Sequence, residues 1–576
     1  MYGISGICDH KKKIELNGPS HQPISLDNRY KIVYIGVLNN SNSIREELKA
    51  LGHEFNSNED PEVIVNSYVQ WKEDCVEKYE GKFIFAIYDE SNKTLFVARD
   101  KMGIMPAYYS QKGNTFIFSS DITSILSFPA VSRDINEEKI YEFLTLGFTF
   151  GENTFFKDIN RLEQANYCLV KEGRIIKKKK YWEHKPVYAR NEEKIQDTAQ
   201  IEDQLINNLK DAISSQAVNT GIPAGFELSG GIDSSFLVAL ASKYDLIQKP
   251  IKTYSVIMKN TILDESRYIE EVATRNNIEH QYFSFTYKQF YENIYEAAKY
   301  YEEPLGFSST PFMYSFFTQL KDRTLYAGDG SDELFGGYDW YGESARMEKR
   351  SSIISKYGNS DWQGNIKKAS PDNFNQHLKK CLLGDAGYNV INDLLDNKQL
   401  SNNIDLGDYI SEDDNYINNH LYFEQQTRMV RCLEEKSKLA MVNGIDVKLP
   451  YLHEPFVIWA RDLPPYLKVF ADQRKFVLKK AASRYFSDSF VYRKKTGFQA
   501  PVCSWLVDRN IMGKLLGILS EKRTKKRQWF NNSLIDSIVE DFVQTVKTNA
   551  CSKKCYGNII WRLINFEIWQ RIFIDP

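Results

Sequence analysis

The sequence lacks the features that mark membrane proteins and nucleic-acid-binding proteins. No stretch reaches the roughly 18 to 20 apolar residues that a membrane-spanning helix needs, and IIWRLINFEIWQRIFI is interrupted four times by polar residues. The formal net charge of −2 gives no long-range field that would attract a polyanion. We therefore expect no nucleic acid and no membrane as a partner.

Cysteines with metal-ligand spacing and a secretory signal are missing as well. The chain has eight cysteines, but Cys551 and Cys555 have no second Cys or His pair nearby to complete a zinc site. At the N-terminus, Asp9, His10 and three lysines follow only a few apolar residues, which excludes the long apolar segment of a signal peptide. We expect reduced thiols and a cytoplasmic location.

The chain has enough length and apolar content for more than one hydrophobic core. It has 576 residues, with 35 Tyr and 34 Phe. Up to about residue 187, short β-rich segments such as KIVYIGVL, GKFIFAIYD and TFIFSS alternate with turn residues. Two helical patterns, SIREELKALG and DPEVIVNSYVQWKED, lie among them. This pattern predicts an α+β domain with antiparallel sheet.

A different pattern begins after a polar stretch at residues 188–203. The segments GFELS, KTYSVIM, HQYFSFT and TLYAG read as strands, and the first three are each followed by a helical pattern. Strands that alternate with helices are typical of a parallel sheet with helices on its faces. The second part of the chain is therefore expected to be an α/β domain.

The stretch FELSGGIDSSFLVALA carries the strongest chemical signal. It predicts a strand that ends at Leu228, a glycine turn over residues 229–231, and a helix that opens near Asp233. Backbone amides at such a turn bind an anion such as pyrophosphate. The loop is not a Walker motif, because GxxxxGK[ST] is absent. A plain strand-to-helix turn with an N-cap is the alternative for this loop alone.

A second loop, LYAGDGSDELFGGY, follows about a hundred residues later. A predicted strand ends at Ala327, and Asp329, Asp332 and Glu333 lie on the turn after it. Carboxylates at the carboxyl edge of a parallel sheet suit Mg²⁺, which prefers one or two carboxylates together with phosphate oxygens. An acidic turn with a helix-capping Asp is the alternative reading of any one of these residues.

Four motifs in order, SGGIDSS, GDGSDELFGGY, GIDVKLPYLHEP and KKTGFQAPVCSWL, resemble the asparagine synthetase family. Upstream, GKFIFAIYDESNKTLFVARDKMGIMPAYY resembles that family's glutaminase domain. The resemblance implies a class II amidotransferase-like (Ntn) sandwich over residues 1–187. It implies an α/β adenine nucleotide alpha hydrolase-like synthetase domain, a PP-loop ATP pyrophosphatase, over residues 200–576. With ATP and Mg²⁺ as cofactors, such a domain adenylates a carboxylate and lets an amine displace AMP.

The resemblance also implies roles for individual residues. Asp233 and Asp332 would bind Mg²⁺. Lys495 in the K-x-G-F signature would face the leaving pyrophosphate, and its neighbour Lys494 is the alternative residue for that role. Asp329 and Asp446 stand where asparagine synthetases usually carry Glu, and each is a candidate base for the attacking amine. The residues implied around adenosine and pyrophosphate are Leu228, Ser229, Gly230, Gly231, Asp233, Ser234, Val256, Ala327 and Gly328.

The opening stretch MYGISGICDH departs from the family pattern. Family glutaminases have a cysteine nucleophile at position 2, where this chain has Tyr2. A phenol with a pKa of about 10 is a poor acyl-transfer nucleophile. The family's oxyanion-hole motif NGEIYN also appears as IGVLNN, with Ile35 in place of the Asn donor. These changes predict that the glutaminase is degenerate while the synthetase remains.

Without glutamine hydrolysis the nitrogen must come from another source, and three readings follow. In the first, an amine of the substrate closes a ring, as the resemblance to lasso-peptide cyclases and to β-lactam and carbapenam synthetases implies. The sequence favours a precursor peptide, with a leader peptidase and a leader-binding protein as partners, because Asp329 is not the Tyr of β-lactam synthetases. A β-lactam/carbapenam-type synthetase acting on a small amino acid is the alternative form of this first reading. The other two readings are an ammonia-dependent asparagine synthetase and an inactive scaffold protein.

Overall fold

A computed structural model describes most of the chain in two compact units. The described residues are 3–9, 15–18, 29–186, 198–217, 224–257, 264–346, 390–395, 409, 415–470, 473–494, 502–507, 513–548 and 556–575. The first unit comprises Met1–Asn136, Phe150–His184 and Val430–Gly444. The second comprises Glu137–Thr149, Lys185–Met429 and Ile445–Pro576. Two short segments, 137–149 and 430–444, thus belong to a different unit from their neighbours in sequence.

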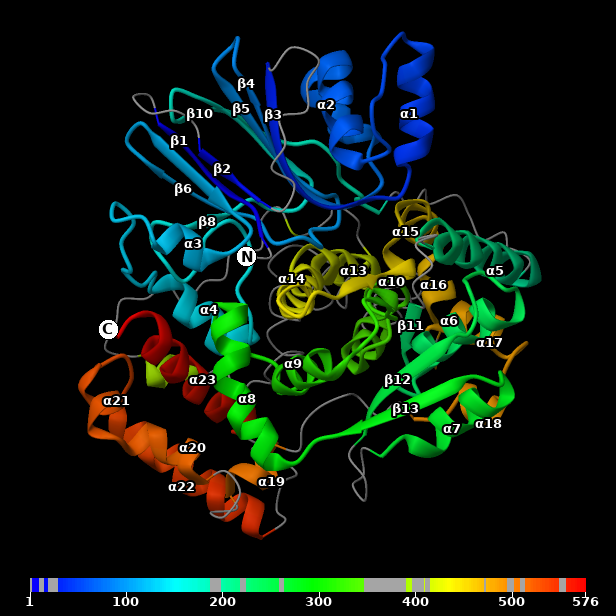
Figure 1. Ribbon diagram of the computed structural model, residues 1–576. Coiled ribbons are helices and arrows are strands. Elements are labelled where there is room, and N and C mark those ends of the chain that lie inside the picture. Colours follow the sequence, from blue (N-terminus) through cyan, green and yellow to red (C-terminus); the bar gives the residue numbers. More distant parts are fainter. Residues whose placement is uncertain are drawn as a thin grey trace, which may run out of the picture. The chain divides into compact units, whose positions relative to one another are not determined.

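The first unit contains two antiparallel five-stranded sheets (Figure 1). Their strand orders are β2-β1-β7-β6-β8 and β10-β9-β5-β4-β3. The strands are β1 (Ser5–Asp9), β2 (Glu15–Asn17), β3 (Tyr30–Leu38), β4 (Gly81–Asp89), β5 (Thr94–Arg99), β6 (Tyr108–Lys112), β7 (Thr115–Ser119), β8 (Asn160–Arg161), β9 (Asn166–Lys171) and β10 (Arg174–Lys180). Its helices are α1 (Ser41–Ala50), α2 (Asp60–Trp71), η1 (Lys72–Lys78), α3 (Ile122–Leu126) and most of α14 (Arg428–Met441). The strands and helices expected from sequence up to residue 187 are present.

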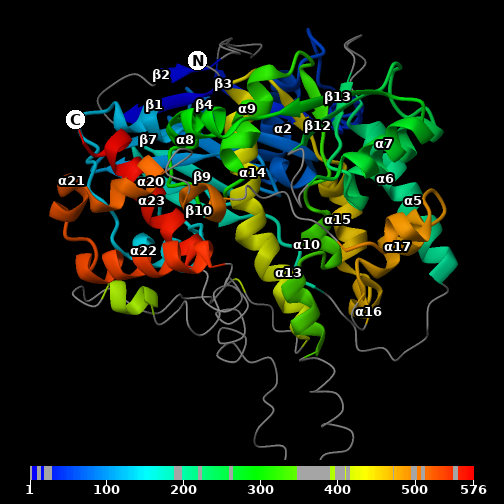
Figure 2. The ribbon, with the colours of Figure 1, turned by 90° about the horizontal axis from the view of Figure 1, so that it is seen from below.

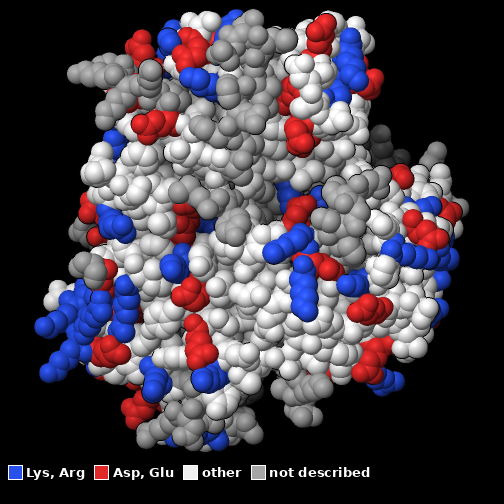
Figure 3. Space-filling model, viewed as in Figure 1, with Lys and Arg blue, Asp and Glu red and all other residues white. Residues whose placement is uncertain are grey.

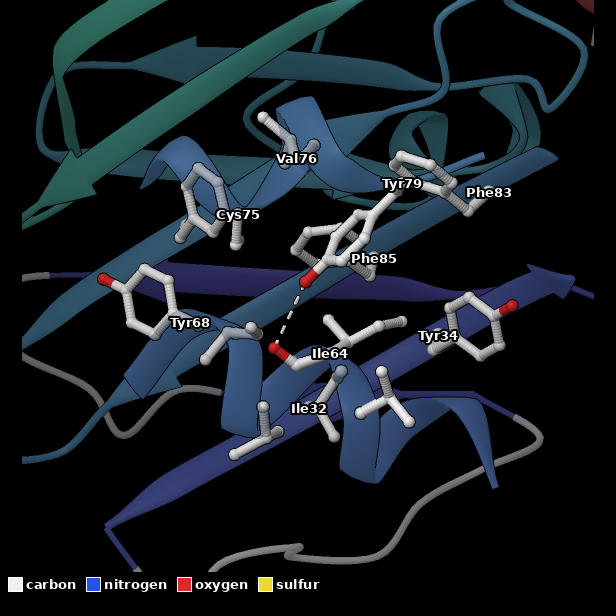
Figure 4. Close-up of a cluster of buried hydrophobic side chains, with 14 of the residues drawn as sticks. Ile32, Tyr34, Ile64, Tyr68, Cys75, Val76, Tyr79, Phe83 and Phe85 are labelled. Atoms are coloured by element: carbon white, nitrogen blue, oxygen red, sulfur yellow. Dashed lines mark hydrogen bonds between the residues drawn. The ribbon is translucent and has the colours of Figure 1, made fainter. Parts of the chain in front are cut away.

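Hydrophobic side chains fill both faces of the β3-containing sheet. On one face, residues of both sheets form a shared core that includes Val33, Ile84 and Phe118. On the other, α2 and η1 cover the sheet, and Figure 4 shows Tyr68, Tyr79 and the Phe residues of β4 packed together there. The buried Tyr79 hydroxyl donates to the carbonyl oxygen of Ile64 at 3.4 Å. Alternating strand residues therefore serve two cores, as expected for a sheet buried on both sides.

A buried ion cluster holds part of α14 in the first unit. Glu434, whose side chain is 0% exposed, accepts a hydrogen bond from Arg99 Nη2 at 2.6 Å and is paired with Arg431. Arg99 also donates to the carbonyl oxygens of Gly103, Met105 and Leu162. Although burial alone would raise it, Arg431 and Arg99 lower the pKa of Glu434 to about 2.

The second unit contains a parallel five-stranded sheet in the order β13-β12-β11-β14-β15. Its strands are β11 (Ala224–Glu227), β12 (Lys252–Ile257), β13 (Glu279–Ser284), β14 (Thr324–Tyr326) and β15 (Asp446–Lys448), and β16 (Val469–Phe470) and β17 (Gln473–Arg474) form a separate pair. Helices follow the strands as the alternating pattern predicts, which gives an α/β fold. The sequence did not indicate β15, which joins the sheet from about 120 residues beyond β14.

Helices make up most of the rest of the second unit. The helices up to the end of the parallel sheet are α4 (Glu138–Leu146), α5 (Thr198–Ser215), α6 (Ile232–Lys243), α7 (Ser266–Arg275), α8 (Tyr287–Tyr301), α9 (Thr310–Gln319), α10 (Ser331–Phe335) and α13 (Tyr416–Gln426). Those after it are η3 (Pro450–Leu452), α15 (Glu454–Arg461), α16 (Pro465–Lys468), α17 (Phe476–Ala482), α18 (Asp488–Val491), α19 (Val502–Val507), α20 (Gly513–Gly517), η4 (Ile518–Ser520), α21 (Lys522–Lys526), α22 (Asn532–Lys547) and α23 (Gly557–Phe573). Figures 1 and 2 both show α20, α22 and α23 gathered together. Among the described helices, none has the length and hydropathy to cross a bilayer.

The basic run KRTKKR forms α21, which has no buried residue. Figure 3 shows these positive side chains as a group at the lower left. Three of them are in ion pairs: Arg523 pairs with Asp575, Lys525 Nζ lies 2.8 Å from Asp536, and Arg527 Nε lies 2.7 Å from Glu567. Residues 522–527 are therefore an ion-paired surface segment.

Candidate functional site

The two loops singled out from sequence leave the carboxyl ends of adjacent parallel strands. Phe226 of β11 is in register with Tyr326 of β14, and their rings stack 4.8 Å apart. The glycine loop follows β11, and the acidic loop follows β14. The expectation that both loops share one edge of one sheet is met, and this edge is where ligands bind in open α/β sheets.

The glycine loop is closed by its own hydrogen bonds. Gly230 has φ of +77°, a left-handed conformation that favours glycine. The Ser229 amide donates to Ser234 Oγ at 3.1 Å, and the Gly231 amide donates to Ser229 Oγ at 3.2 Å. Gly231 precedes the 12-residue helix α6. A turn fixed in this way at a helix N-terminus is suited to bind an anion through backbone amides.

Asp233 and Asp332 approach one another across a single lysine. Lys475 Nζ lies 2.5 Å from Asp233 Oδ1 and 2.6 Å from Asp332 Oδ1, and the lysine side chain is only 3% exposed. Although burial alone would lower it, the two carboxylates raise the pKa of Lys475. The Ser331 hydroxyl adds a hydrogen bond to Asp233 Oδ1 at 2.7 Å. The two predicted metal ligands thus share one positive charge.

Lys475 and the acidic loop are in close contact at Gly337. Lys475 itself has φ of +56°, directly before α17. Gly337 lies so close that a Cβ at this position would be 1.7 Å from Asp332 Oδ1 and 2.2 Å from Lys475 Cε. Tyr451 supports the other side, since its hydroxyl donates to the carbonyl oxygen of Asp233 at 3.1 Å. The geometry therefore depends on glycine at position 337.

Arg493, which precedes the K-x-G-F signature by two positions in sequence, binds the glycine loop. Its guanidinium donates to the carbonyl oxygen of Gly230 and, at 2.9 Å, to Glu265 Oε1. The same group lies over the Tyr268 ring, 3.9 Å from the ring centroid. Lys494 is exposed, whereas Lys495 lies outside the described residues. Arg493 itself is thus fixed beside the anion-binding turn.

The residues implied for adenosine line the same edge. Leu228 and Ala327 are fully buried after their strands, and the Leu228 amide donates to the Tyr254 carbonyl oxygen at 2.8 Å. Val256 is half-buried on β12. A Cβ on Gly328 would lie 3.1 Å from the Ser234 amide nitrogen, so the two loops pack closely here. These contacts place the residues beside the glycine loop, and their roles remain predictions.

The two candidate bases have different positions relative to this edge. Asp329 follows β14 directly and lies in the acidic loop. Asp446 opens β15 in register with Thr324, at the amino end of the paired strands, and lies 2.8 Å from Lys448 Nζ. The position of Asp329 fits contact with a bound acyl group better than that of Asp446 does.

The described acidic residues fit Mg²⁺ only together with a nucleotide. No group of three or more His, Cys, Asp or Glu side chains in the described ranges is arranged to hold a metal ion. Asp233 and Asp332 offer two carboxylates around one cation position. Two carboxylates with phosphate oxygens are a ligand set that Mg²⁺ accepts. The donors present therefore suit a phosphate-bound ion.

In the first unit, Ile35 and Asp60 make packing and hydrogen-bond contacts with other residues of the same unit. Ile35 packs against the core between the two sheets and offers no side-chain donor. Asp60 Oδ2 accepts hydrogen bonds from the Tyr34 hydroxyl and the Leu38 amide, both at 2.9 Å. Tyr2 lies outside the described residues.

Three residues at the synthetase-like edge were not indicated by the sequence: Lys475, Tyr451 and Arg493. Lys475 lies in RKFVLKK among other lysines, and 242 positions separate it from Asp233. Tyr451 lies within the recognised motif GIDVKLPYLHEP, and Arg493 directly precedes the recognised motif KKTGFQAPVCSWL. The closeness of Tyr451 and Arg493 to recognised motifs in the sequence was the signal that could have identified them as site residues.

Known families match almost the whole chain. Residues 204–571 match the family described as Asparagine synthase, and residues 12–182 match the Glutamine amidotransferase domain. Together with the folds of the two units, these matches confirm the expected fold class: a class II amidotransferase-like domain and an adenine nucleotide alpha hydrolase-like domain with a parallel sheet.

Individual relatives agree with these families. Asparagine synthetase (glutamine-hydrolyzing) 1 of Bacillus subtilis (strain 168) is 26% identical over 96% of this chain and 87% of its own length. Asparagine synthetase (glutamine-hydrolyzing) 3 of the same organism is 27% identical over 81% of this chain and 75% of its own length. A putative asparagine synthetase (glutamine-hydrolyzing) 2 of Methanocaldococcus jannaschii is 30% identical over 55% of this chain and 60% of its own length.

Proposed function

This chain belongs to the asparagine synthase family, and we propose that it amidates the carboxylate of a small amino acid with free ammonia instead of nitrogen from glutamine. ATP-dependent amide formation of the asparagine synthetase type follows from the family. The nitrogen source and the acceptor are the proposal. Aspartate is the first acceptor to test, because the relatives that match most of the chain are named asparagine synthetases.

The observation that carries the proposal is the contrast between the two parts of the chain. The adenylation loops keep Ser229 to Ser234 and the GDGSDE sequence. The glutaminase-like part has Tyr2 at the nucleophile position and Ile35 at the oxyanion position. Neither side chain supplies the chemistry that glutamine hydrolysis needs. A reaction that uses free ammonia requires neither a glutaminase nucleophile nor an oxyanion donor.

The site supports a two-step reaction. In the first step a carboxylate oxygen attacks the α-phosphorus of ATP, and the bond to pyrophosphate breaks. The glycine-loop amides and Lys475 would hold the pyrophosphate charge, and Asp233 and Asp332 would hold Mg²⁺, which neutralises phosphate charge when bound. In the second step the lone pair of ammonia attacks the acyl carbon, AMP leaves, and a proton passes to a base, for which Asp329 is the candidate.

The deciding experiment compares nitrogen donors. We expect the full chain with ATP, Mg²⁺ and aspartate to form AMP and asparagine with ammonium chloride but not with glutamine. Tyr2→Ala is expected to leave AMP release unchanged, because that residue has no part in the synthetase reaction. Product formation from glutamine at a rate like that from ammonium would overturn the ammonia assignment.

Ring closure by an internal amine is a second candidate, favoured by Asp329 and Asp446, which replace the usual Glu of asparagine synthetases. A precursor peptide with an Asp or Glu side chain would then be adenylated and closed to a macrolactam. Mass spectrometry separates the two candidates. Ring closure removes the mass of one water from a peptide without added ammonium, and amidation of aspartate requires ammonium.

Gly337→Ala is expected to abolish pyrophosphate exchange into ATP while the chain still folds. The added methyl group would overlap Asp332 and the Lys475 stem, so the acidic loop must move. A comparable substitution at Gly342, where a Cβ meets nothing within 4 Å, is the control. Exchange at the wild-type rate in Gly337→Ala would show that the position of Asp332 is not critical.

A further inference from the structure

A second cluster of buried charges lies behind the acidic loop, on α13. This helix is buried along its whole length, although it carries His420 and Glu424. The Glu424 side chain is 0% exposed, and neither of its oxygens accepts a hydrogen bond within the described part of the chain. Its neighbours are Arg428 Nη1 at 3.6 Å and His420 Nε2 at 3.9 Å. A buried carboxyl group without hydrogen bonds is costly unless a ligand or a proton satisfies it.

Glu333 brings a second buried carboxyl group to the same place. It follows Asp332 in the acidic loop, is 4% exposed, and accepts a hydrogen bond from the Tyr338 hydroxyl at 2.7 Å. Gln425, the neighbour of Glu424 on α13, donates to the Glu333 carbonyl oxygen at 2.8 Å. Burial and the charge of Asp332 raise the pKa of Glu333. The α13 cluster is therefore joined directly to the loop that carries Asp332.

Arg428 and His420 are the basic side chains next to these two carboxyl groups. Arg428 is the cation whose charge acts on both Glu333 and Glu424. Its guanidinium lies over aromatic rings, 4.4 Å from the Tyr338 centroid and 5.0 Å from the Trp340 centroid. His420 Nδ1 lies 2.8 Å from Ser344 Oγ. One guanidinium therefore lies near two buried carboxyl groups, and neither oxygen of Glu424 accepts a hydrogen bond from it or from any other described residue.

A buried hydroxyl group provides an independent sign of a missing polar partner. Tyr341 is 0% exposed, and its hydroxyl has no hydrogen-bond partner among the described residues. Burial, with the charges of Glu424 and Glu333, raises the pKa of Tyr341, so its hydroxyl lies within the field of both carboxylates. Its ring packs edge-on to His420, with centroids 4.9 Å apart. The tyrosine and the carboxylate are thus unsatisfied at the same place.

We propose that Glu424, Glu333 and Tyr341 form a binding site for a primary ammonium group next to the adenylation site. An ammonium ion donates several hydrogen bonds, and the two oxygens of Glu424 and the Tyr341 hydroxyl oxygen, which lack partners among the described residues, can accept them. The proposal deepens the proposed function and rests on it for the identity of the ligand. Two sources share this chemistry: ammonium as nitrogen donor, and the α-ammonium group of the acceptor amino acid.

Steady-state kinetics of Glu424→Gln tests the site and distinguishes the two sources. Loss of one charge-assisted contact is expected to raise a KM by about 10- to 100-fold. If the ammonium ion is the ligand, the KM for ammonium rises and the KM for aspartate in pyrophosphate exchange does not. If the α-ammonium group is the ligand, the KM for aspartate rises in both assays. Both KM values within about twofold of wild type would overturn the proposal.

Glu567→Gln is the matched control. Glu567 is a glutamate of the same unit, 2% exposed, and it lies 2.7 Å from Arg527 and 2.8 Å from Arg571. Its neutralisation disturbs a buried carboxylate to the same degree but changes no group of the α13 cluster. We expect its KM values to equal those of the wild type. If Glu424→Gln fails to fold, Glu424→Asp, which keeps the charge, is measured in its place in the same assays.

Thermal melting tests the site without any catalytic activity. A ligand that binds only the folded chain raises the melting temperature. With the full chain, ammonium chloride is expected to raise Tm above sodium chloride at equal ionic strength, in the wild type and Glu567→Gln but not in Glu424→Gln. If the ligand is the α-ammonium group, sodium aspartate is expected to give this response instead of ammonium chloride. If neither salt raises the Tm of the wild type above that in sodium chloride while aspartate is still amidated, the site fails and the proposed function stands. If the ligand raises Tm but no amide forms, the site stands and the proposed function fails.

Discussion

Lys475→Met is expected to reduce pyrophosphate exchange into ATP by about 10²- to 10³-fold, the effect typical of removing one charged group from a preorganised site. Methionine keeps most of the side-chain volume but removes the charge. Asp233 and Asp332 would then face each other without the ammonium group that lies 2.5 and 2.6 Å from them. Their repulsion and the loss of a cation for pyrophosphate both act against adenylation.

The measurement is exchange of labelled pyrophosphate at saturating ATP and aspartate, with circular dichroism to establish folding. Lys480→Met is the control, because Lys480 is exposed on α17, the helix that Lys475 directly precedes. We expect the control to keep full exchange. A folded Lys475→Met chain with exchange near the wild-type rate would mean that Lys475 only fills the space between Asp233 and Asp332.

Much of this edge of the sheet was predictable from sequence. The alternation of strands and helices indicates a parallel sheet, and loops after parallel strands meet at one edge. The motifs SGGIDSS and GDGSDE therefore predicted that Asp233 and Asp332 lie close together, and the structure joins them through one lysine. The family match extends this agreement to the fold of both units.

Other features depend on contacts that no local pattern records. Lys475 reaches Asp233 across 242 positions, and RKFVLKK has no signature that separates it from its neighbouring lysines. The helix YINNHLYFEQQ has the polar composition of an exposed helix, yet all of its residues are buried. Likewise α14 follows α13 directly in sequence, but residues 430–444 pack in the other unit. Long-range packing overrides local composition at each of these positions.

Glu434→Gln is expected to destabilise the first unit by about 3 to 5 kcal/mol, the usual cost of removing one partner from a buried ion pair. Glutamine has nearly the same shape but carries no charge, so Arg99 and Arg431 would remain buried without their counterion. Urea denaturation measures the change. Glu90→Gln is the control, because Glu90 pairs with Lys31 and Lys93 at the surface, where such a loss is worth about 1 kcal/mol or less.

The same residue predicts a pH dependence of stability. Since Arg431 and Arg99 hold the pKa of Glu434 at about 2, below its ordinary value of 4.5, its ionised form stabilises the folded state at pH values above 4.5. This contribution, about 3 kcal/mol from the difference between the two pKa values, is lost as the pH falls from about 4.5 towards 2. The wild type should therefore lose more stability than Glu434→Gln between pH 6 and pH 3. Parallel losses in both chains would show that Glu434 titrates at its ordinary pKa and that the buried cluster does not hold α14 in place.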